Sequence, residues 1–481
     1  MEAQTNGVMP KPIKRVVQPP SYPTTSLEFL QSIKTHTNEA LLSATKIKII
    51  VVGAGLGGLA TSCALARRGH DVTCFEQAER LGEVGAGIQM PPNSARLLLK
   101  WGLGEYLDER VVEPTCITFR RWQNGAELSR TALVPDHRQK FGAPYYVVHR
   151  AHFHDSLHQL ALKLGAKVKI ASRVIEYDPE TPSITLANGE VHYADLIVAA
   201  DGINSIARET VTGARTDSRN TGFAAYRATI DVEKIKADPE IAWIVEEAKI
   251  NLWVGDGRHV MTYPIASGES FNLVLSHPLS GTAKKQSPSE VLEEMRLNFE
   301  GWDSRLIKLM SLIHTTMKWP LCNLPSISTY VHSASKMIIL GDGAHAMLPY
   351  MSQGAAMAVE DGAALAEALH LASSPEDIPE ALRIWNAVRW QRGCQMQEAS
   401  SLNGILWHFK DGPEQEARDA AMRLGSFGKD MPNGDGIPGD TVKLNGDPNQ
   451  WNDRETSQWC FGYDTEEAVR RYHSLQTLAK L

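Results

Sequence analysis

The stretch from Lys46 to Gln77, KIKIIVVGAGLGGLATSCALARRGHDVTCFEQ, decides the fold of this chain. Residues 47–52 are apolar apart from Lys48, typical of a short strand buried on both faces. GAGLGG at 53–58 supplies G-x-G-x-x-G where that strand must turn into a helix. The helix is predicted to end at Gly69, and residues 71–75 read as the next strand. Strand, turn, helix and strand together predict a dinucleotide-binding βαβ unit.

The glycines of this turn indicate what the unit binds. They permit a tight turn and let the backbone approach a pyrophosphate, whose charge is stabilised by the N-terminus of the following helix. Glu76 follows twenty-three positions after Gly53, where a carboxylate can accept both hydrogens of a ribose diol. The glycine pattern recurs at 434–439, but without a preceding strand and with Pro438 where a helix should begin. We interpret that second copy as a surface loop.

Composition narrows the class of protein. The 481 residues are 43% hydrophobic and 22% charged, as in soluble globular proteins. A net charge of −7 argues against nucleic acid or an anionic membrane as the main partner. No apolar run approaches the roughly 20 residues that span a bilayer, and no signal peptide is recognisable, which predicts a cytoplasmic protein. Six cysteines without metal-ligand spacing predict free thiols, buried at Cys63 and Cys74, and no metal site.

The pattern of predicted helices and strands divides the chain into five segments. Residues 221–335 hold successive predicted strands without intervening helices, which predicts an antiparallel sheet inserted in an α/β framework. The predicted segments are a flexible extension at 1–45, the first part of the α/β domain at 46–220, the inserted sheet at 221–335, the return of the α/β domain at 336–372, and a C-terminal helical region with a loop-rich tail at 373–481.

Two further strands end in small and polar residues. The segment at 193–200, apolar apart from Asp195, leads into Asp201-Gly202, and the apolar run at 337–340 leads into GDGAH at 341–345 and an alanine-rich helix. Ligands of open α/β sheets bind at such carboxyl ends. The loop at 81–93 contains three glycines and two prolines, which predicts either an ordered loop close to a ligand or a plain surface connection.

Three motifs in this order resemble the single-component FAD-dependent aromatic hydroxylases, most closely the fungal salicylate-hydroxylase-like monooxygenases. They are GAGLGG with Glu76, Ala200-Asp201-Gly202 with Arg208, and Gly341-Asp342-Gly343-Ala344-His345 with Pro349 and Gln353-Gly354. The resemblance covers residues 46 to about 411, with Gly343 where alanine is usual. It implies an α/β fold, in which a Rossmann-like FAD-binding domain of the p-hydroxybenzoate hydroxylase type carries an inserted antiparallel β-sheet substrate domain and C-terminal helices.

The resemblance also implies the cofactors, FAD and a transient co-substrate, NADPH or NADH, which must bind over the flavin. Arg150 would reach the phosphate or ribityl region, and Asp342 the ribityl chain, unless Asp342 is an ordinary helix cap. A helix starting at Gln353-Gly354 would present its positive end to the charge on reduced flavin. The full set of implied cofactor contacts is Gly53, Gly55, Gly58, Glu76, Gln89, Arg150, Asp201, Asp342, Pro349, Gly354 and Ala355.

Candidate catalytic residues lie in the inserted sheet. A strand period of two places His259, Met261 and Tyr263 on one face, with His259 and Tyr263 about 13 Å apart along the strand. By resemblance, His259 would be the base or relay, Arg227 the anchor for a phenolate or carboxylate, and Tyr263 a hydrogen-bonding orienter. Each also has an ordinary interpretation, as a core histidine, a salt-bridged strand arginine and a packed core tyrosine. His345 is predicted to be structural or a neighbour of the flavin ring.

The implied chemistry explains why both a base and a cation are needed. A flavin C4a-hydroperoxide transfers an electrophilic oxygen, which a phenolate accepts far better than a phenol. Proton transfer from a phenol of pKa ~10 to a histidine of pKa ~6.5 is uphill by about 5 kcal/mol in water. A nearby cation such as Arg227 lowers a phenol pKa by roughly 1–3 units and brings the transfer within reach.

The sequence therefore predicts an FAD-dependent, NAD(P)H-consuming monooxygenase that hydroxylates a small phenolic or aromatic acid, with loss of CO2 if the substrate is an ortho-hydroxybenzoate. Three alternatives remain open: dearomatisation of a phenolic polyketide or epoxidation of an indole alkaloid by the same chemistry, a flavin oxidoreductase without oxygen insertion, and a non-catalytic flavin-binding regulator. The predicted partners are the aromatic substrate, O2 and NAD(P)H, without nucleic acid or membrane, for a monomer or homodimer.

Overall fold

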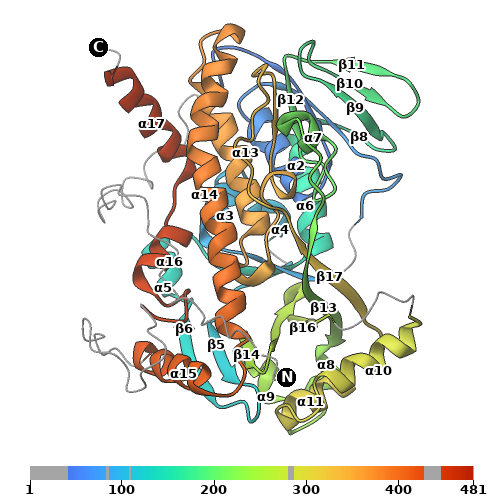
Figure 1. The fold of residues 1–481 in the computed structure, drawn as a ribbon, viewed down its shortest axis with the longest axis vertical. Coiled ribbons are helices and arrows are strands. Elements are labelled where there is room, and N and C mark those ends of the chain that lie inside the picture. The colour runs from blue at the N-terminus through green and yellow to red at the C-terminus, as the bar shows by residue number, and fades with distance from the viewer. Residues whose placement is uncertain (1–41, 83–85, 108–109, 280–285, 427–445, 480–481) are drawn as a thin grey trace, which may run out of the picture.

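The computed structural model describes residues 42–82, 86–107, 110–279, 286–426 and 446–479 (Figure 1). The second glycine copy at 434–439 and nearly all of the predicted extension at 1–45 lie outside these ranges. A parallel sheet of order β18-β12-β1-β2-β8 forms the first layer. Its strands are β1 (Lys48–Val52), β2 (Asp71–Phe75), β8 (Lys167–Lys169), β12 (Leu196–Ala199) and β18 (Met337–Ile339).

Helices cover this sheet because its central strands are apolar on both faces. Val52 pairs with Phe75 on one side and with Ala199 on the other, and all three are buried. Helix α2 (Leu56–Ala66) packs between α6 (Arg150–Lys163) and α13 (Gly354–His370), and ten of its eleven residues are buried. The predicted βαβ unit is therefore confirmed, and it lies in the main hydrophobic core.

The second layer is a seven-stranded sheet of order β17-β13-β16-β15-β14-β5-β6. Its strands are β5 (Cys116–Arg121), β6 (Glu127–Ala132), β13 (Arg219–Asp231), β14 (Ile250–Gly255), β15 (Arg258–Ile265), β16 (Ser270–Pro278) and β17 (Met317–Asn323). The sheet is larger than the predicted insert, because β5 and β6 join it from earlier in the chain. It is also not wholly antiparallel, since β14 pairs in parallel with β5 and this pairing covers the apolar Ile117 and Phe119.

The two faces of this sheet bury different clusters. One face carries Met261 and Tyr263 and packs toward the parallel-sheet layer, and the other carries Val260 and Trp253 and packs on α10 (Pro288–Asn298) and α11 (Ser304–Ser311). The predicted alternation along β15 is confirmed. We call the face with Met261 the inner face.

Two small sheets complete the fold. One has the order β3-β7-β4 and connects the layers, because Gly87 of β3 donates its N–H to Oδ1 of Asn272 at 2.7 Å. The strands of these sheets are β3 (Gly87–Met90), β4 (Val111–Val112), β7 (Tyr146–His149), β9 (Val174–Asp178), β10 (Ser183–Leu186) and β11 (Val191–Tyr193). The shorter helices are α3 (Pro92–Lys100), α4 (Gly104–Leu107), α5 (Asp136–Phe141), α7 (Ala207–Thr212), α8 (Val232–Lys236), α9 (Trp243–Glu246), α12 (Asp342–His345), η2 (Ala266–Gly268), η3 (Pro349–Met351) and η4 (Pro375–Asp377).

The C-terminal part is more regular than predicted. Figure 1 shows α14 (Ile378–Trp407) running from the parallel sheet to the seven-stranded sheet, followed by α15 (Pro413–Ser426). The prediction of a loop-rich tail is wrong for α16 (Arg454–Phe461) and α17 (Thr465–Ala479), which form because they bury apolar faces in the two cores.

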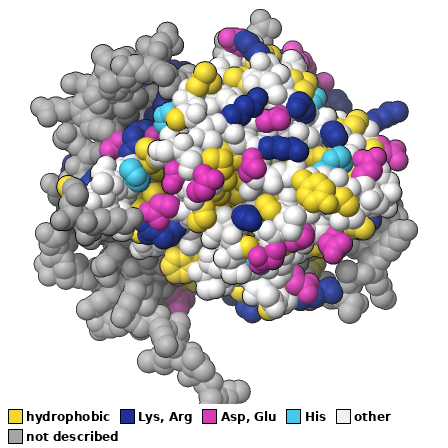
Figure 2. All heavy atoms as spheres, turned by 90° about the horizontal axis from the view of Figure 1, so that it is seen from above, with side chains coloured by type: hydrophobic (Ala, Val, Ile, Leu, Met, Phe, Trp, Pro, Cys, Tyr) yellow, Lys and Arg dark blue, Asp and Glu magenta, His cyan; other side chains and the backbone are white. Residues whose placement is uncertain are grey.

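The surface in Figure 2 mixes acidic and basic side chains without a field of one sign. Within the described ranges, no helix is both long enough and apolar enough to cross a bilayer. In the same ranges, no group of three or more His, Cys, Asp or Glu side chains is arranged to hold a metal ion. The six cysteines are free, and Cys63 and Cys74 are buried as predicted.

Candidate functional site

The three predicted motifs meet at one edge of the parallel sheet. Gly53, Asp201 and Asp342 follow β1, β12 and β18, which are adjacent and parallel, so their carboxyl ends share that edge. The approach is close, since an ideal Cβ on Gly53 would lie 2.4 Å from the carbonyl oxygen of Ala200. An ideal Cβ on Gly343 would lie 3.5 Å from Oδ1 of Asp201. The structure therefore brings these distant segments together.

The glycine turn leaves backbone open at this edge. Gly53 has φ +100°, and a Cβ on Gly58 would lie 1.8 Å from the carbonyl oxygen of Gly53, so α2 can pack this closely only with glycine there. By contrast, a Cβ on Gly55 would have no atom of the described residues within 4 Å. Gly55 is also the N-cap of α2 and supplies no side-chain cap. Open space in front of a helix N-terminus suits a pyrophosphate.

Glu76 holds the turn from the neighbouring strand. Its Oε2 accepts the N–H of Ala54 at 2.7 Å, and its Oε1 accepts the N–H of Ala78 at 2.8 Å. Each carboxylate oxygen keeps a second lone pair, so the side chain can still accept hydrogen bonds from a diol.

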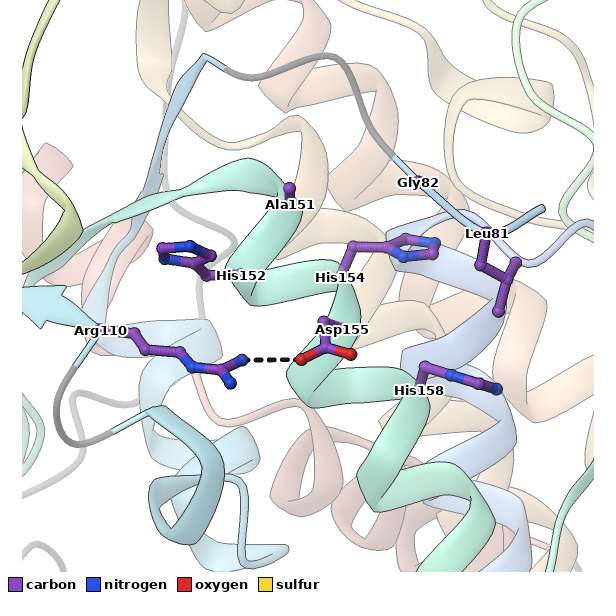
Figure 3. Close-up of a pocket in the computed structure, with 8 residues that line it drawn as sticks. All are labelled: Leu81, Gly82, Arg110, Ala151, His152, His154, Asp155 and His158. Atoms are coloured by element: carbon purple, nitrogen blue, oxygen red, sulfur yellow. Dashed lines mark hydrogen bonds and ion pairs between the residues drawn. The ribbon is translucent and has the colours of Figure 1, made fainter.

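A cavity of about 380 Å³ lies beside the turn, between Leu81-Gly82 and the first turns of α6 (Figure 3). His154 in its wall lies 2.7 Å, through Nε2, from the carbonyl oxygen of Ala54. Across the cavity, Arg110 and Asp155 form an ion pair at 2.7 Å. The cavity therefore adjoins the glycine turn, at the start of the helix that Arg150 begins.

Asp201 and Arg208 connect the second motif to the third. Oδ2 of Asp201 accepts the Tyr177 hydroxyl at 3.3 Å and the N–H of Ala207 at 3.2 Å, and burial raises the pKa of Asp201. The guanidinium of Arg208 is buried and donates to the carbonyl oxygens of Gly343 at 3.0 Å and Ala344 at 3.1 Å. Arg208 therefore fixes the backbone of the GDGAH loop.

A buried carboxylate fixes that loop from the other side. Asp361 on α13 accepts hydrogen bonds from Nε2 of His345 at 2.6 Å, the N–H of Gly341 at 3.1 Å and Nε of Arg389 at 2.8 Å. Burial alone would raise the pKa of Asp361, but the charges of His345 and Arg389 hold it well below its usual value. His345 is thus structural, one of its two predicted roles.

The N-terminus of α13 is open at the same edge. Gly354 and Ala355 are its first residues, and the N-cap Gln353 supplies no side-chain cap. Among the residues that the structure describes, no atom would lie within 4 Å of a Cβ on Gly354. Oε1 of Gln353 accepts Nδ2 of Asn93 at 2.9 Å, which fixes the helix start. Asn93 was not predicted, because no local pattern marks its pairing with a residue 260 positions away.

The other predicted cofactor contacts surround this edge. Asp342 is exposed at the start of α12, where Gly341 and not Asp342 is the N-cap, and Pro349 is exposed at the start of η3. Arg150 donates its backbone N–H to the carbonyl oxygen of Ala86 at 2.9 Å. Gln89 is different, because its side chain is buried, accepts the Tyr145 hydroxyl and donates to Sδ of Met261 at 2.9 Å.

The inner face of the seven-stranded sheet carries the candidate catalytic side chains. Arg227 and Met261 both pair with Val274 from opposite sides, so all three point to that face. Burial raises the pKa of Tyr263, and the positive charge of Arg227 opposes that rise. Arg227 and Tyr263 therefore lie within electrostatic reach of each other, beside β3, where a Cβ on Gly87 would contact the Tyr263 ring at 2.4 Å.

His259 lies on the same face and is only 3% exposed. Its Nδ1 is 2.7 Å from Nε2 of His408, and its ring packs edge-on against Tyr350, with ring centroids 5.1 Å apart. Burial holds the pKa of His259 well below its usual value, so the ring is a neutral imidazole at pH 7. His408, just after α14, was not predicted, because no local pattern marks a residue 149 positions away as its partner.

These residues fit an FAD at the shared edge. The two uncapped helix starts, α2 and α13, offer N–H groups to a pyrophosphate and to a charged ring, and Glu76 lies at the end of β2. At these two helix starts, an ideal Cβ on Gly55 or Gly354 would have no atom of the described residues within 4 Å, which leaves room there for a ligand.

Comparison with known proteins agrees with this geometry. A family described as FAD binding domain matches residues 46–400. The FAD-dependent monooxygenase OpS4 of Beauveria bassiana is 35% identical over 382 residues, covering 78% of this chain and 89% of that protein. The 3-amino-4-hydroxybenzoate 2-monooxygenase PtnB3 of Streptomyces platensis is 34% identical, covering 79% of this chain and 93% of that protein. The predicted resemblance and the predicted FAD cofactor are confirmed.

Solved structures show the same fold. A salicylate hydroxylase substrate complex superposes with a TM-score of 0.70 at 24% identity, covering 89% of this chain and 98% of that one. CtdE in complex with FAD and a substrate superposes with a TM-score of 0.72 at 22% identity, covering 90% and 99%. The predicted fold class is therefore confirmed.

Proposed function

The chain belongs to the FAD binding domain family and, within it, to the FAD-dependent monooxygenases, and from that premise we propose that it hydroxylates a small phenolic aromatic acid with NAD(P)H and O2. Two relatives that are about one third identical to this chain are named for their substrates, an amino-hydroxybenzoate and a hydroxybenzoate. FAD, when bound and reduced by the nicotinamide nucleotide, supplies the oxygen in an electrophilic form.

The observation that carries the proposal is the inner face of the seven-stranded sheet. It presents a cation, Arg227, near a phenol, Tyr263, with the apolar Val274 on the strand between theirs and Met261 beside Tyr263 on β15. Such a wall suits a flat ring with one anionic substituent, because apolar atoms contact the ring and the guanidinium pairs with the charge.

The roles we assign follow from charge and protonation. Arg227 stabilises the phenolate or the carboxylate of the substrate, and Tyr263 orients it through a hydrogen bond. His259 is neutral, so it can accept the phenolic proton. Gly53, Gly55, Gly58, Glu76, Gln89, Arg150, Asp201, Asp342, Pro349, Gly354 and Ala355 hold the FAD in this proposal.

The test is a panel of salicylate, 3-hydroxybenzoate, 4-hydroxybenzoate and 3-amino-4-hydroxybenzoate with NADH and with NADPH. We expect at least one acid to stimulate oxidation of the reduced nucleotide and to yield a product that carries one atom from ¹⁸O2. Release of CO2 with salicylate would identify decarboxylative hydroxylation. Nucleotide oxidation without labelled product from any phenol would favour a flavin oxidoreductase instead.

The proposal also places the enzyme in the cytoplasm, acting as a monomer or homodimer without nucleic acid or membrane. The mixed charge of the face in Figure 2 and the net charge of −7 support the absence of nucleic acid and anionic membrane as partners. Sedimentation of the holoenzyme, with and without DNA or anionic vesicles, tests these absences and the oligomeric state.

A further inference from the structure

The hydrogen-bonded pair of His259 and His408 connects the inner face of the sheet to the surface. His259 is 3% exposed, whereas His408 is partly exposed at the end of α14. Nδ1 of His259 and Nε2 of His408 are 2.7 Å apart, and the rings lie within 17° of parallel. The pair is therefore a continuous path of two imidazoles from a buried position to a partly exposed one.

The surroundings hold His408 in this orientation. The ring of Phe223 lies flat against it, with centroids 4.7 Å apart and an interplanar angle of 16°. The turn between β14 and β15 fixes the backbone, because Gly257 donates its N–H to the carbonyl oxygen of His408 at 3.2 Å and Asp256 donates to that of Phe409 at 3.2 Å. The end of α14 is thus attached directly to the strand that carries His259.

Burial keeps both rings neutral, because it lowers the pKa of His259 and that of His408. Burial, aided by the charge of Arg418 on α15, lowers the pKa of His408 to about 3. Arg418 itself donates to the carbonyl oxygen of Leu406 at 2.8 Å. On the β14–β15 turn, Arg258 is paired with Asp256 at 2.9 Å, so that end adds little net charge. Since a neutral imidazole has one N–H and one bare nitrogen, one ring must donate to the other.

We infer that His408 is the second member of a proton relay that removes the substrate's phenolic proton from the buried site through His259. The inference rests on the proposed function. The O–H bond of the substrate breaks and its proton binds Nε2 of His259. The proton on Nδ1 of His259 passes to Nε2 of His408, and the proton on Nδ1 of His408 leaves to water. Both rings end neutral with their tautomers exchanged, and the phenolate remains at Arg227.

This relay answers the difficulty of a buried histidine base. A single His259 would have to stay positively charged in an apolar site, which its burial opposes. Passing the proton on within the same step leaves no charge on either ring. His408 does not touch the substrate and acts through His259, whose ring it positions and whose proton it accepts.

The kinetic test uses the holoenzyme variants His408→Gln and His408→Phe with 3-amino-4-hydroxybenzoate between pH 6 and 9. Gln can hydrogen-bond to His259 but cannot pass a proton on, and Phe keeps the ring packing. The control is His277→Phe, a buried histidine of the same sheet that stacks on Tyr226 on the opposite face, with centroids 4.4 Å apart. We expect both His408 variants to lose on the order of 10²-fold in hydroxylation rate at pH 6 and to regain it at higher pH, where phenolate forms without a base.

Two results would overturn the relay: a His408→Gln enzyme with the rate and pH profile of the wild type, or an equal loss in His277→Phe. Retained FAD absorbance shows that a variant has folded. Histidine ¹⁵N NMR of the holoenzyme provides a readout that needs no turnover. It should find one proton shared between Nδ1 of His259 and Nε2 of His408 at pH 7, and two protonated or two bare nitrogens would contradict the pair. If the wild type gives no oxygenated product, the substrate proposal fails while NMR still decides the pair.

Discussion

Nε2 of His345 lies 2.6 Å from Oδ2 of Asp361, and neither side chain has any exposed surface. The same carboxylate accepts the N–H of Gly341, so one buried anion fixes the loop that begins with the third glycine motif. It lies on α13, the helix whose first residues face the proposed flavin site. The geometry of that site therefore depends on a buried ion network around Asp361.

Asp361→Asn should destabilise the protein by about 3–5 kcal/mol, because it leaves the buried guanidinium of Arg389 without its full charge partner. Urea unfolding of the holoenzyme measures this loss. The matched control is Asp217→Asn, which breaks a fully exposed ion pair with Arg215 and should leave the unfolding midpoint unchanged. Equal midpoints for both variants would contradict the structural role of Asp361.

Alanine substitutions at two glycines of the first motif should affect different properties, folding stability at one and FAD affinity at the other. Gly58→Ala places a Cβ against the carbonyl oxygen of Gly53, so we expect a lower melting temperature even of the FAD-free protein. The new Cβ of Gly55→Ala would lie more than 4 Å from every atom in the described ranges, so the FAD-free protein should melt as the wild type does while FAD affinity falls at least tenfold. Calorimetry and flavin fluorescence titration measure the two effects. Normal FAD affinity in Gly55→Ala would place the pyrophosphate elsewhere.

Arg227→Met should weaken the binding of aromatic acids and slow hydroxylation by about 10²-fold, because the cation that stabilises the anionic substrate is gone. Arg219→Met, on the exposed start of the same strand, is the control and should behave as the wild type. Steady-state kinetics with the acid panel measures both. A fully active Arg227→Met enzyme would assign the arginine to packing alone.

His277 should make folding sensitive to acid. Burial lowers its pKa to about 4, against about 6.5 in the unfolded chain, so between these values only the unfolded state binds the proton. Its contribution to stability is complete above pH 6.5 and falls by up to about 1.4 kcal/mol per pH unit as the pH drops toward 4. His277→Phe should flatten the change in the urea midpoint between pH 6.5 and 4. An unchanged slope would show that other groups govern it.

The sequence predicted the parallel sheet and its three glycine-bearing ends because that information is local. The apolar run before Gly53 and the turn residues after it specify strand, turn and helix within some twenty positions. The inner face of β15 could also be predicted locally, because side chains alternate with a period of two along a strand and this places His259 and Tyr263 on one face.

Pairings between segments far apart in the chain could not be predicted from the sequence. His408 meets His259 only because α14 ends against the β14–β15 turn, and β5 joins β14 because their apolar faces need cover. Gln89 illustrates the same limit, since its bond to Met261 depends on how two sheets approach each other. Such contacts follow from tertiary packing, which leaves no periodic trace in one segment.

The entry of β5 and β6 into the seven-stranded sheet bears on how substrate preference can be exchanged between relatives. A chimera that receives only residues 221–335 of this chain would leave behind the two strands at 116–132 that cover the edge of β14. Ile250 and Leu252 would then pair with residues of the host instead of Ile117 and Phe119. An exchange of this sheet between relatives therefore has to include two separate segments, 116–132 and 221–335. Chimeras that receive both segments should stay soluble, whereas chimeras that receive only one should aggregate.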